Sequence, residues 1–419
     1  MSVFTDKSIR SAETFIVGHV DRCCDLLLDQ GKNGEPINIA HLADYLVFDI
    51  MCDLSFGKSF DVKESPSSQL RTVPHTFENY TAFMSNVSEF VSAYLLSEIS
   101  TTDRLGNKIA RSPFLPAWLW FKSHGLDQPP EYARPKDMMA LFALIRTSIV
   151  QRLHEEEHKN FETEDGRKDI FHYLFHAKDT ETGKPAFSNN DLALEAQLLL
   201  TTGLGTTATT LSAFFFYITR NKTAYQRLIK EIRGNFSSAD EIQSSSKLSS
   251  CFYLRACLDE TLRMTPAAPG ELLRTILPGG LNINDQFLPE GTLVGISSWS
   301  LFHSDESYPD PWVYRPERWI VDKDRGVGPE DVLRAQAAFF PFSIGPVSCV
   351  GQRLAKSILL ITIAKIMWRM DVVSLPDSHL GEGSEQLGWG RRDKNVFQIK
   401  DGTFALREGP IVQFMEKNT

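Results

Sequence analysis

The sequence predicts one domain that is mainly α-helical and carries small β-sheets. Residues 11–30 and 37–56 repeat apolar side chains at intervals of three and four, the period of an amphipathic helix. Residues 279–296 alternate and contain turn residues, which is typical of a strand pair, and residues 388–410 predict a terminal hairpin. With 419 residues, 42% of them hydrophobic, the chain is long enough to bury one large core. We therefore expect a single domain over residues 1–419.

Charge and cysteine content exclude some classes of partner. The formal net charge is −9 and no basic stretch offsets it, so no nucleic-acid partner is expected. Few, irregularly spaced cysteines without a CxxC pair predict an intracellular, reducing compartment and no disulfide framework. These cysteines are Cys23, Cys24, Cys52, Cys251, Cys257 and Cys349.

No segment has the pattern of a membrane anchor. Residues 1–8 lack the hydrophobic run of a signal peptide. No later window reaches the roughly 18 uninterrupted apolar residues of a membrane span. We expect the chain as given to have no transmembrane helix.

Residues 136–157 and 169–177 predict two more helices, the first of them long and ending in an acidic run. His172 and His176 on the second are four residues apart, which is the spacing of a helical metal pair. Because no HExxH glutamate accompanies them, we expect a packed or solvated face there and no metal site.

The longest predicted helix runs over residues 188–221. Ser188 and Asp191 favour a cap at its start, and a rise of 1.5 Å per residue gives a length of about 45 Å. Apolar residues occur most of the way round, which predicts that the helix crosses the interior of the domain.

The middle of this helix contains Gly203 and Gly205, followed by Thr206 and Thr207. Each glycine costs a helix up to about 1 kcal/mol, so a compensating role is expected. Two interpretations remain open. The small side chains leave a groove in which a threonine bends the helix and makes room for water, or they allow tight packing against another helix.

Two further patterns follow. Glu260 and Arg263 are three residues apart on one helical face and can form an ion pair, which is worth only a few tenths of a kcal/mol when exposed. The segment from Pro316 to Trp319, which includes Arg318, follows further along the chain.

The most informative stretch contains Phe342, Gly345, Cys349 and Gly351, and an apolar helical run starts directly behind it at residue 352. This pattern predicts a loop that presents a sulfur at a helix N-terminus. The helix dipole and free N–H groups stabilise a thiolate there. The glycines allow the backbone to approach a flat ligand closely.

These patterns, in this order, resemble the motifs of the cytochrome P450 family. Cys349 falls on the proximal thiolate ligand of the haem in the pattern FxxGxRxCxG, which Phe342, Gly345 and Gly351 also match. The resemblance covers almost the whole chain and is greatest to P450s of filamentous fungi that tailor secondary metabolites. It implies a haem b cofactor whose iron is bound by Cys349.

The resemblance also implies roles for the other motifs. Gly203 and Thr206 match the oxygen-binding groove (A/G)GxDTT, and Thr207 lies beside them. Arg274 resembles an arginine that pairs with a haem propionate. Glu260, Arg263 and Arg318 match a Glu-Arg-Arg network that is structural and not catalytic.

The chain departs from the family pattern in three places. Gly205 stands where the groove carries an acid, and Val347 stands where the loop carries an arginine. The WxxxR motif and roughly a hundred residues before it are missing, so the expected fold is a P450 fold without its N-terminal anchor, its first helices and part of its first sheet.

The resemblance implies a monooxygenase that inserts one oxygen atom of O2 into an apolar small molecule. Two alternatives stay open: a haem-binding remnant without this activity, and a P450 that rearranges or couples substrates, which needs no acid at Gly205. Electrons are expected from NADPH-cytochrome P450 reductase, docking near Arg353 and Lys356. The family is usually anchored on the cytosolic face of the endoplasmic reticulum.

Two segments are candidates for the substrate side. The aromatic cluster of residues 114–121, from Phe114 to Phe121, is either a core turn or part of a roof over the substrate entrance that contacts a membrane surface. Residues 402–404 stand where the family has its last substrate-contacting turn.

Overall fold

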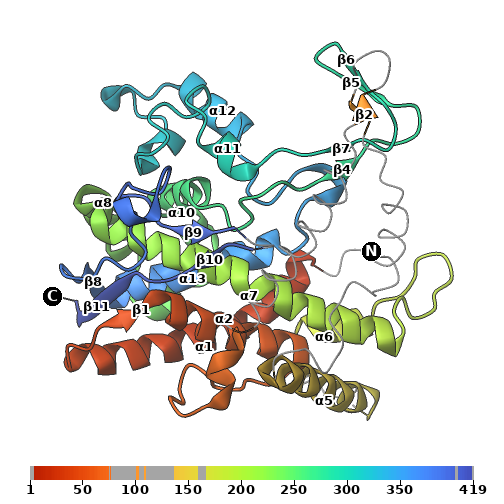
Figure 1. Cartoon of the computed structure of the whole chain (residues 1–419). Coiled ribbons are helices and arrows are strands. Elements are labelled where there is room, and N and C mark those ends of the chain that lie inside the picture. Colours follow the sequence, from red (N-terminus) through yellow and green to blue (C-terminus); the bar gives the residue numbers. More distant parts are fainter. Residues whose placement is uncertain are drawn as a thin grey trace.

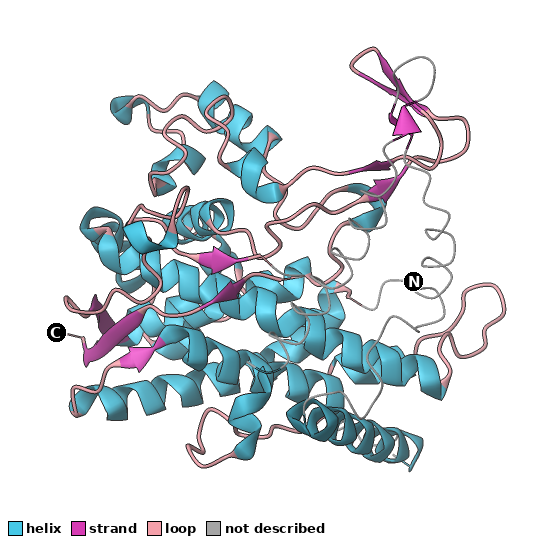
Figure 2. Cartoon of the chain, viewed as in Figure 1, coloured by secondary structure: helices cyan, strands magenta, loops and turns pink. Residues whose placement is uncertain are grey.

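The computed structural model describes residues 4–74, 76, 101–102, 108–109, 136–158, 167–401 and 404–417. This part of the chain is mainly helical, with short strands beside and between the helices (Figures 1 and 2). The helices are α1 (Asp6–Lys32), α2 (Ile39–Phe56), α5 (Lys136–His158), α6 (Ile170–Phe175), α7 (Asn189–Arg220), α8 (Lys222–Asn235), α9 (Ser246–Ser249), α10 (Phe252–Met264), α11 (Ser298–Phe302), α12 (Pro329–Ala337) and α13 (Gln352–Arg369). The 3-10 turns are η1 (Gln69–Thr72), η3 (Ala239–Glu241), η4 (Pro316–Trp319), η5 (Lys323–Arg325), η6 (Gly345–Val347) and η7 (Glu385–Leu387). The aromatic cluster at residues 114–121 lies outside the described residues.

The strands form small antiparallel sheets, as predicted for this fold class. A three-stranded sheet has the order β1-β11-β8, and pairs are formed by β4 with β7, β5 with β6, β9 with β10 and β2 with β3. The strands are β1 (Ile37–Asn38), β2 (Thr101–Thr102), β3 (Lys108–Ile109), β4 (Arg274–Thr275), β5 (Leu281–Ile283), β6 (Gln286–Leu288), β7 (Leu293–Val294), β8 (Met370–Ser374), β9 (Ile399–Lys400), β10 (Leu406–Arg407) and β11 (Ile411–Glu416). The strand pair in 279–296 and the terminal hairpin are thereby confirmed.

The ends of the long helices follow from local sequence. The Asn38 side chain accepts a hydrogen bond from the amide of Ala40 and caps α2, which ends at Gly57 with φ 72°. Ser188 and Asp191 form a capping box at the start of α7. These caps stop each helix within a few residues of the bounds that the sequence predicts.

Helix α7 crosses the core, as its composition predicts. It has 32 residues, which corresponds to about 48 Å, and its second half is buried on all sides. It packs along α2, and Figure 1 shows the other long helices grouped around the two. By length and composition α7 could span a membrane, but 67% of its most apolar 18 residues are buried inside the fold, as in a core helix.

Helices α1 and α13 lie side by side and run parallel. Arg353 pairs with Asp6 at one end, and Lys365, which is fully buried, binds Asp21 at 2.8 Å further along. Arg369 pairs with Asp25 at 2.8 Å at the far end. The residue numbers of the paired side chains increase in the same direction along both helices. These ion pairs therefore fix the position of α13 along α1.

Candidate functional site

The loop before α13 presents the Cys349 side chain to solvent. Gly345 opens the short turn η6 with φ +71°, a conformation that disfavours residues with a Cβ. The Cys349 amide then donates to the Phe342 carbonyl at 2.8 Å, and the Gln352 amide donates to the Cys349 carbonyl at 3.3 Å. The sulfur therefore lies at the N-terminal end of an 18-residue helix, as the sequence predicts.

The two flanking positions fit the same arrangement. Gly351 lies beside the sulfur, since a Cβ added there would be 3.8 Å from the Cys349 Sγ, an ordinary contact distance. Lys356 lies in the first turns of α13, and its Nζ is 5.4 Å from the centre of the Phe342 ring. The loop is thus held by its own backbone on one side and by α13 on the other.

Cys349 differs from the other cysteines in its accessibility. The other five are buried, and burial raises the pKa of the Cys23 thiol to about 12 and that of Cys257 well above its usual value. Such thiols are inert toward ligands. Among the six, Cys349 alone is exposed and able to bind a metal ion.

The surroundings of the thiol fit an apolar, flat cofactor. On the loop itself Ile344, Val347 and Val350 are 65%, 55% and 62% exposed. Contiguous exposed apolar side chains around a reactive group mark a ligand surface and not a packed core. Val347, which replaces the loop arginine of the family, belongs to this apolar set. A haem would be held by Cys349 and by this surface.

Arg274 is exposed at the start of β4. Its Nη1 donates to the carbonyls of Leu272 at 3.2 Å and Leu273 at 2.8 Å. Within the described residues its Nε and Nη2 have no partner, so they remain available to an anion such as a propionate. The side chains of Leu272 and Leu273 are 47% and 51% exposed, so apolar side chains are exposed here as they are on the cysteine loop.

The predicted oxygen groove lies in a regular stretch of α7. The Thr206 Oγ1 donates to the Thr202 carbonyl at 2.8 Å, which is the back-bonding expected of a threonine in a helix. Gly205 and Thr207 are buried, and no carboxylate stands at position 205. The roles of Thr206 and Thr207 in handling water remain predictions.

Gly203 faces α2 closely. A Cβ added there would lie 2.7 Å from the Met51 Cε and 2.9 Å from its Sδ. This contact supports the second interpretation of the small residues, tight packing between helices, at this one position. The role of Gly203 in oxygen binding therefore stays a prediction.

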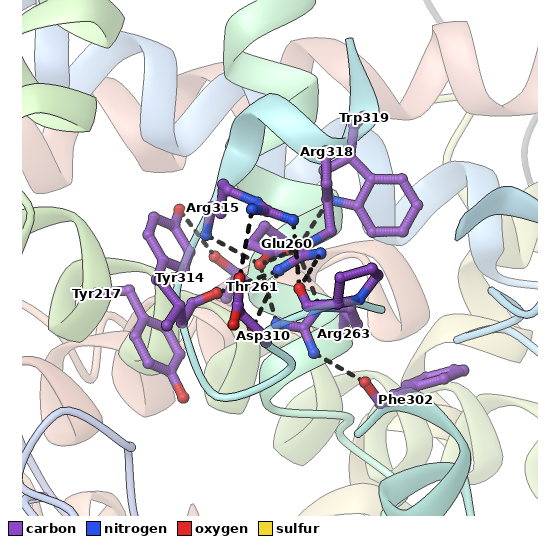
Figure 3. Close-up of polar contacts among 12 residues, drawn as sticks. Tyr217, Glu260, Thr261, Arg263, Phe302, Asp310, Tyr314, Arg315, Arg318 and Trp319 are labelled. Atoms are coloured by element: carbon purple, nitrogen blue, oxygen red, sulfur yellow. Dashed lines mark hydrogen bonds and ion pairs between the residues drawn. The ribbon is translucent and has the colours of Figure 1, made fainter. Parts of the chain in front are cut away.

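Glu260, Arg263 and Arg318 meet in the interior, as predicted (Figure 3). They are 0%, 0% and 4% exposed. Arg263 binds both oxygens of the Glu260 carboxylate at 2.9 and 3.0 Å, and the Arg318 Nε binds Oε1 at 3.0 Å. Burial alone would raise the pKa of Glu260, but the charges of the two arginines outweigh burial and lower it.

Two members of this network are absent from the sequence prediction. The Trp319 Nε1 donates to the Glu260 Oε2 at 3.0 Å, and the backbone amide of Arg315 donates to Oε1 at 3.0 Å. Both residues flank Arg318 in the same short segment. Their position beside a predicted member of the network is the one feature of the sequence that could have indicated them. The Arg315 contact uses a backbone amide, which every residue except proline has, so the residue type cannot predict it.

Aromatic rings connect the network with the cysteine loop. The Trp319 ring lies 4.5 Å from that of Phe339, and the Phe302 ring lies 5.9 Å from that of Phe340. The Phe340 carbonyl accepts a hydrogen bond from the Ser343 amide at 2.9 Å, inside the loop. The network therefore braces the segment that leads to Cys349, which agrees with a structural role.

The terminal turn lies against α7. The Thr209 Oγ1 donates to the Ala405 carbonyl at 3.1 Å. Phe404 is described, whereas residues 402 and 403 lie outside the described part of the chain. This contact brings the end of the predicted substrate turn to the helix that carries Thr206.

Comparison with known proteins agrees with this geometry. The family model described as Cytochrome P450 matches residues 1–395. The cytochrome P450 monooxygenase poxM of Penicillium oxalicum is 32% identical over 98% of this chain and 70% of its own length. The cytochrome P450 monooxygenase apf8 of Gibberella fujikuroi is 33% identical over 96% of this chain and 99% of its own length.

A cytochrome P450 monooxygenase of Gibberella zeae is 28% identical over 99% of this chain and 87% of its own length. These relatives confirm the resemblance to fungal P450s and support a tailoring monooxygenase of secondary metabolism. The cofactor of the family is haem with an axial thiolate, which Cys349 is placed to provide. The chain therefore belongs to the cytochrome P450 family and is a haem-thiolate oxidoreductase of the monooxygenase class.

Proposed function

We propose that this protein inserts one oxygen atom of O2 into an apolar small molecule, as a tailoring step of secondary metabolism. The observation that carries the proposal is the exposed Cys349 thiol at the head of α13, surrounded by the exposed apolar side chains of its own loop. Haem bound through a thiolate favours cleavage of the O–O bond. The chain would contribute the Cys349 thiolate and helix α7, which carries Thr206.

Thr206 is the residue that we propose to position water on the distal side. Its hydroxyl proton is directed to the Thr202 carbonyl, so its oxygen is left as an acceptor. Gly205 adds no carboxylate beside it. Proton supply then depends on water held by Thr206 and Thr207.

We propose that the electron donor is NADPH-cytochrome P450 reductase and that it docks on the face of α13 with Lys356. Lys356 and Arg255, together with Asp259, line a cavity of about 730 Å³ between α10, α12 and α13, so the two cations exceed the one acidic group there. Arg353 lies nearby in sequence, but its guanidinium is paired with Asp6. Positive side chains at such a surface favour an acidic partner and raise its association rate.

We further propose that the protein acts inside the cell. All six cysteines are free thiols, and five of them are buried in the core. Such an inventory suits a reducing compartment. Expression with a fluorescent tag at the C-terminus would test this location directly.

The first test is the carbon-monoxide difference spectrum of the dithionite-reduced protein. We expect a strongly red-shifted Soret band, its loss in Cys349→Ser, and its retention in Cys251→Ser, a matched change of a buried thiol. A band at the position of neutral thiol or histidine ligation, or a protein that does not bind haem, would contradict the proposal and favour a haem-binding remnant.

A second candidate function is rearrangement or coupling of substrates. Gly205 favours it, because these reactions need no acid in the groove. Turnover under 18O2 separates the two: a monooxygenase product contains one labelled oxygen atom, whereas a coupled or rearranged product contains none from O2.

A further inference from the structure

A group of three potential ligands lies between α5 and α6, outside the cysteine loop and the groove of α7. The His172 Nδ1 and the His176 Nε2 each lie 3.2 Å from the same oxygen, Oε2 of Glu156. All three ligand atoms lie within 4.8 Å of one another. In the described ranges no other group of His, Cys, Asp or Glu side chains is gathered in this way.

These separations are those of ligands around one zinc ion. Zinc binds imidazole nitrogen and carboxylate oxygen at 2.0–2.2 Å in tetrahedral geometry, so two neighbouring ligand atoms are about 3.3 Å apart. The two observed N–O distances of 3.2 Å match this value. The two imidazole rings are also adjacent, with centres 4.5 Å apart.

The carboxylate is held in place by a second layer of contacts. The other oxygen of Glu156 binds the Arg152 Nη1 at 2.7 Å. Arg152 also donates to both oxygens of Asp169, at 2.9 and 3.0 Å. Outer partners of this kind orient metal ligands and raise affinity.

Asp169 also positions the histidines. Its Oδ1 accepts the His172 amide at 2.9 Å and caps the start of α6, the helix that carries His172 and has His176 as its C-cap. Arg152 on α5 and the cap of α6 are thus parts of one arrangement. Arg152 and Arg167, whose Nε lies 2.6 Å from the Asp169 Oδ2, balance the charges of Glu156 and Asp169, so an ion would be held by its three ligand atoms and not by an excess of negative charge.

Solvent can reach the group from one side. The Glu156 side chain is 0% exposed, whereas those of His172 and His176 are 19% and 34% exposed. An ion would therefore enter on the histidine side and keep a fourth position for water. Two histidines and one glutamate with an open position form a donor set that zinc uses in other proteins.

We propose that Glu156, His172 and His176 bind one zinc ion, which links α5 to α6. This reverses the expectation from the sequence, in which the two histidines lacked a carboxylate partner. The partner comes from a different helix, which a local motif does not show. The site is independent of the haem and of the monooxygenase activity.

Calorimetric titration of ZnCl2 into the haem-loaded, chelator-treated protein tests the site. We expect one ion per chain. Glu156→Gln, His172→Ala and His176→Ala should each weaken binding at least tenfold, and zinc should raise the Tm of the wild type more than theirs. His154→Gln is the matched control, because His154 is an exposed histidine on α5, and it should bind zinc as the wild type does.

X-ray absorption at the zinc edge keeps the proposal testable if a variant fails to fold, because it needs only the wild type. Nitrogen and oxygen ligands at about 2.0–2.1 Å support the site, whereas sulfur at about 2.3 Å would assign the ion to cysteine thiols and overturn it. Equal affinity in all variants, or no saturable binding, would also overturn it and leave only a hydrogen-bonded cluster.

Discussion

Replacing Glu260 by glutamine is expected to lower the free energy of unfolding by about 3–5 kcal/mol. The substitution keeps the size of the side chain and removes one negative charge. Arg263 and Arg318 then remain in the interior with two positive charges and, among the described residues, without the carboxylate that pairs with both. Loss of one partner of a buried ion pair has this cost because the remaining charge is desolvated without compensation.

The hydrogen bonds lead to the same order of magnitude. The Glu260 Oε1 accepts from Arg263, Arg318 and the Arg315 amide, and Oε2 accepts from Arg263 and Trp319. In either orientation of a glutamine, at least two buried donors face its NH2 group. Each unsatisfied buried donor costs about 1–3 kcal/mol.

The assay is equilibrium unfolding in urea, followed by far-UV circular dichroism with the haem content measured in parallel. Asp29→Asn is the control, because Asp29 and Lys32 have the same i,i+3 spacing and the same 2.9 Å distance but are 70% and 67% exposed. We expect the control to change stability by less than about 0.5 kcal/mol. A loss below about 1 kcal/mol in Glu260→Gln would refute the reasoning. If that variant does not accumulate, Trp319→Phe should still lower stability by about 1 kcal/mol.

Three other predictions test the site. Charge reversal in Lys356→Glu should slow electron transfer from the reductase several-fold at low salt, and the difference from the wild type should shrink at high salt; a salt-independent defect would argue against docking there. Burial raises the pKa of Asp259 to about 6, above its value near 4 in the unfolded chain. The folded state therefore holds this proton more tightly, and the stability that the protonated carboxyl group contributes, complete below pH 4, is lost as the pH rises through 6. Asp259→Asn should therefore raise the free energy of unfolding at pH 7 by about 1–2 kcal/mol and flatten its pH dependence between pH 4 and 6, and unchanged urea midpoints at both pH values would contradict this. Gly203→Ala should raise the Tm less than Gly234→Ala on α8, because the flexible end of Met51 must shift to make room for the new methyl group, whereas the space around Gly234 is open; equal changes in Tm would argue against the contact with Met51.

The predictable part of the fold is the part whose signals are local. Helix α7 has a capping box at Ser188, apolar residues around most of its circumference and a length of 32 residues, and each of these can be read along the chain. Strand β1 has two residues and no period of its own. Its partner is β11, with Ile37 opposite Val412 at the other end of the chain, so this sheet could not be predicted from local pattern.

The site divides in the same way. The position of Cys349 follows from the glycines and the apolar helix beside it in sequence. Glu260 and Arg263 are one helical turn apart, so their pairing is local too. Glu156 and His172 have no such relation, because their contact depends on how α5 packs against α6. Helix packing depends on the whole surface of both helices, so no fixed sequence spacing predicts which residues of two helices will touch.

The parallel arrangement of α1 and α13 limits how the protein can move. A slide of α13 by one turn, about 5.4 Å, would separate Arg353, Lys365 and Arg369 from their aspartates at the same time. Since Lys365 is fully buried, such a slide would also leave a desolvated charge behind. The sulfur at the head of α13 is therefore held at a fixed position relative to α1.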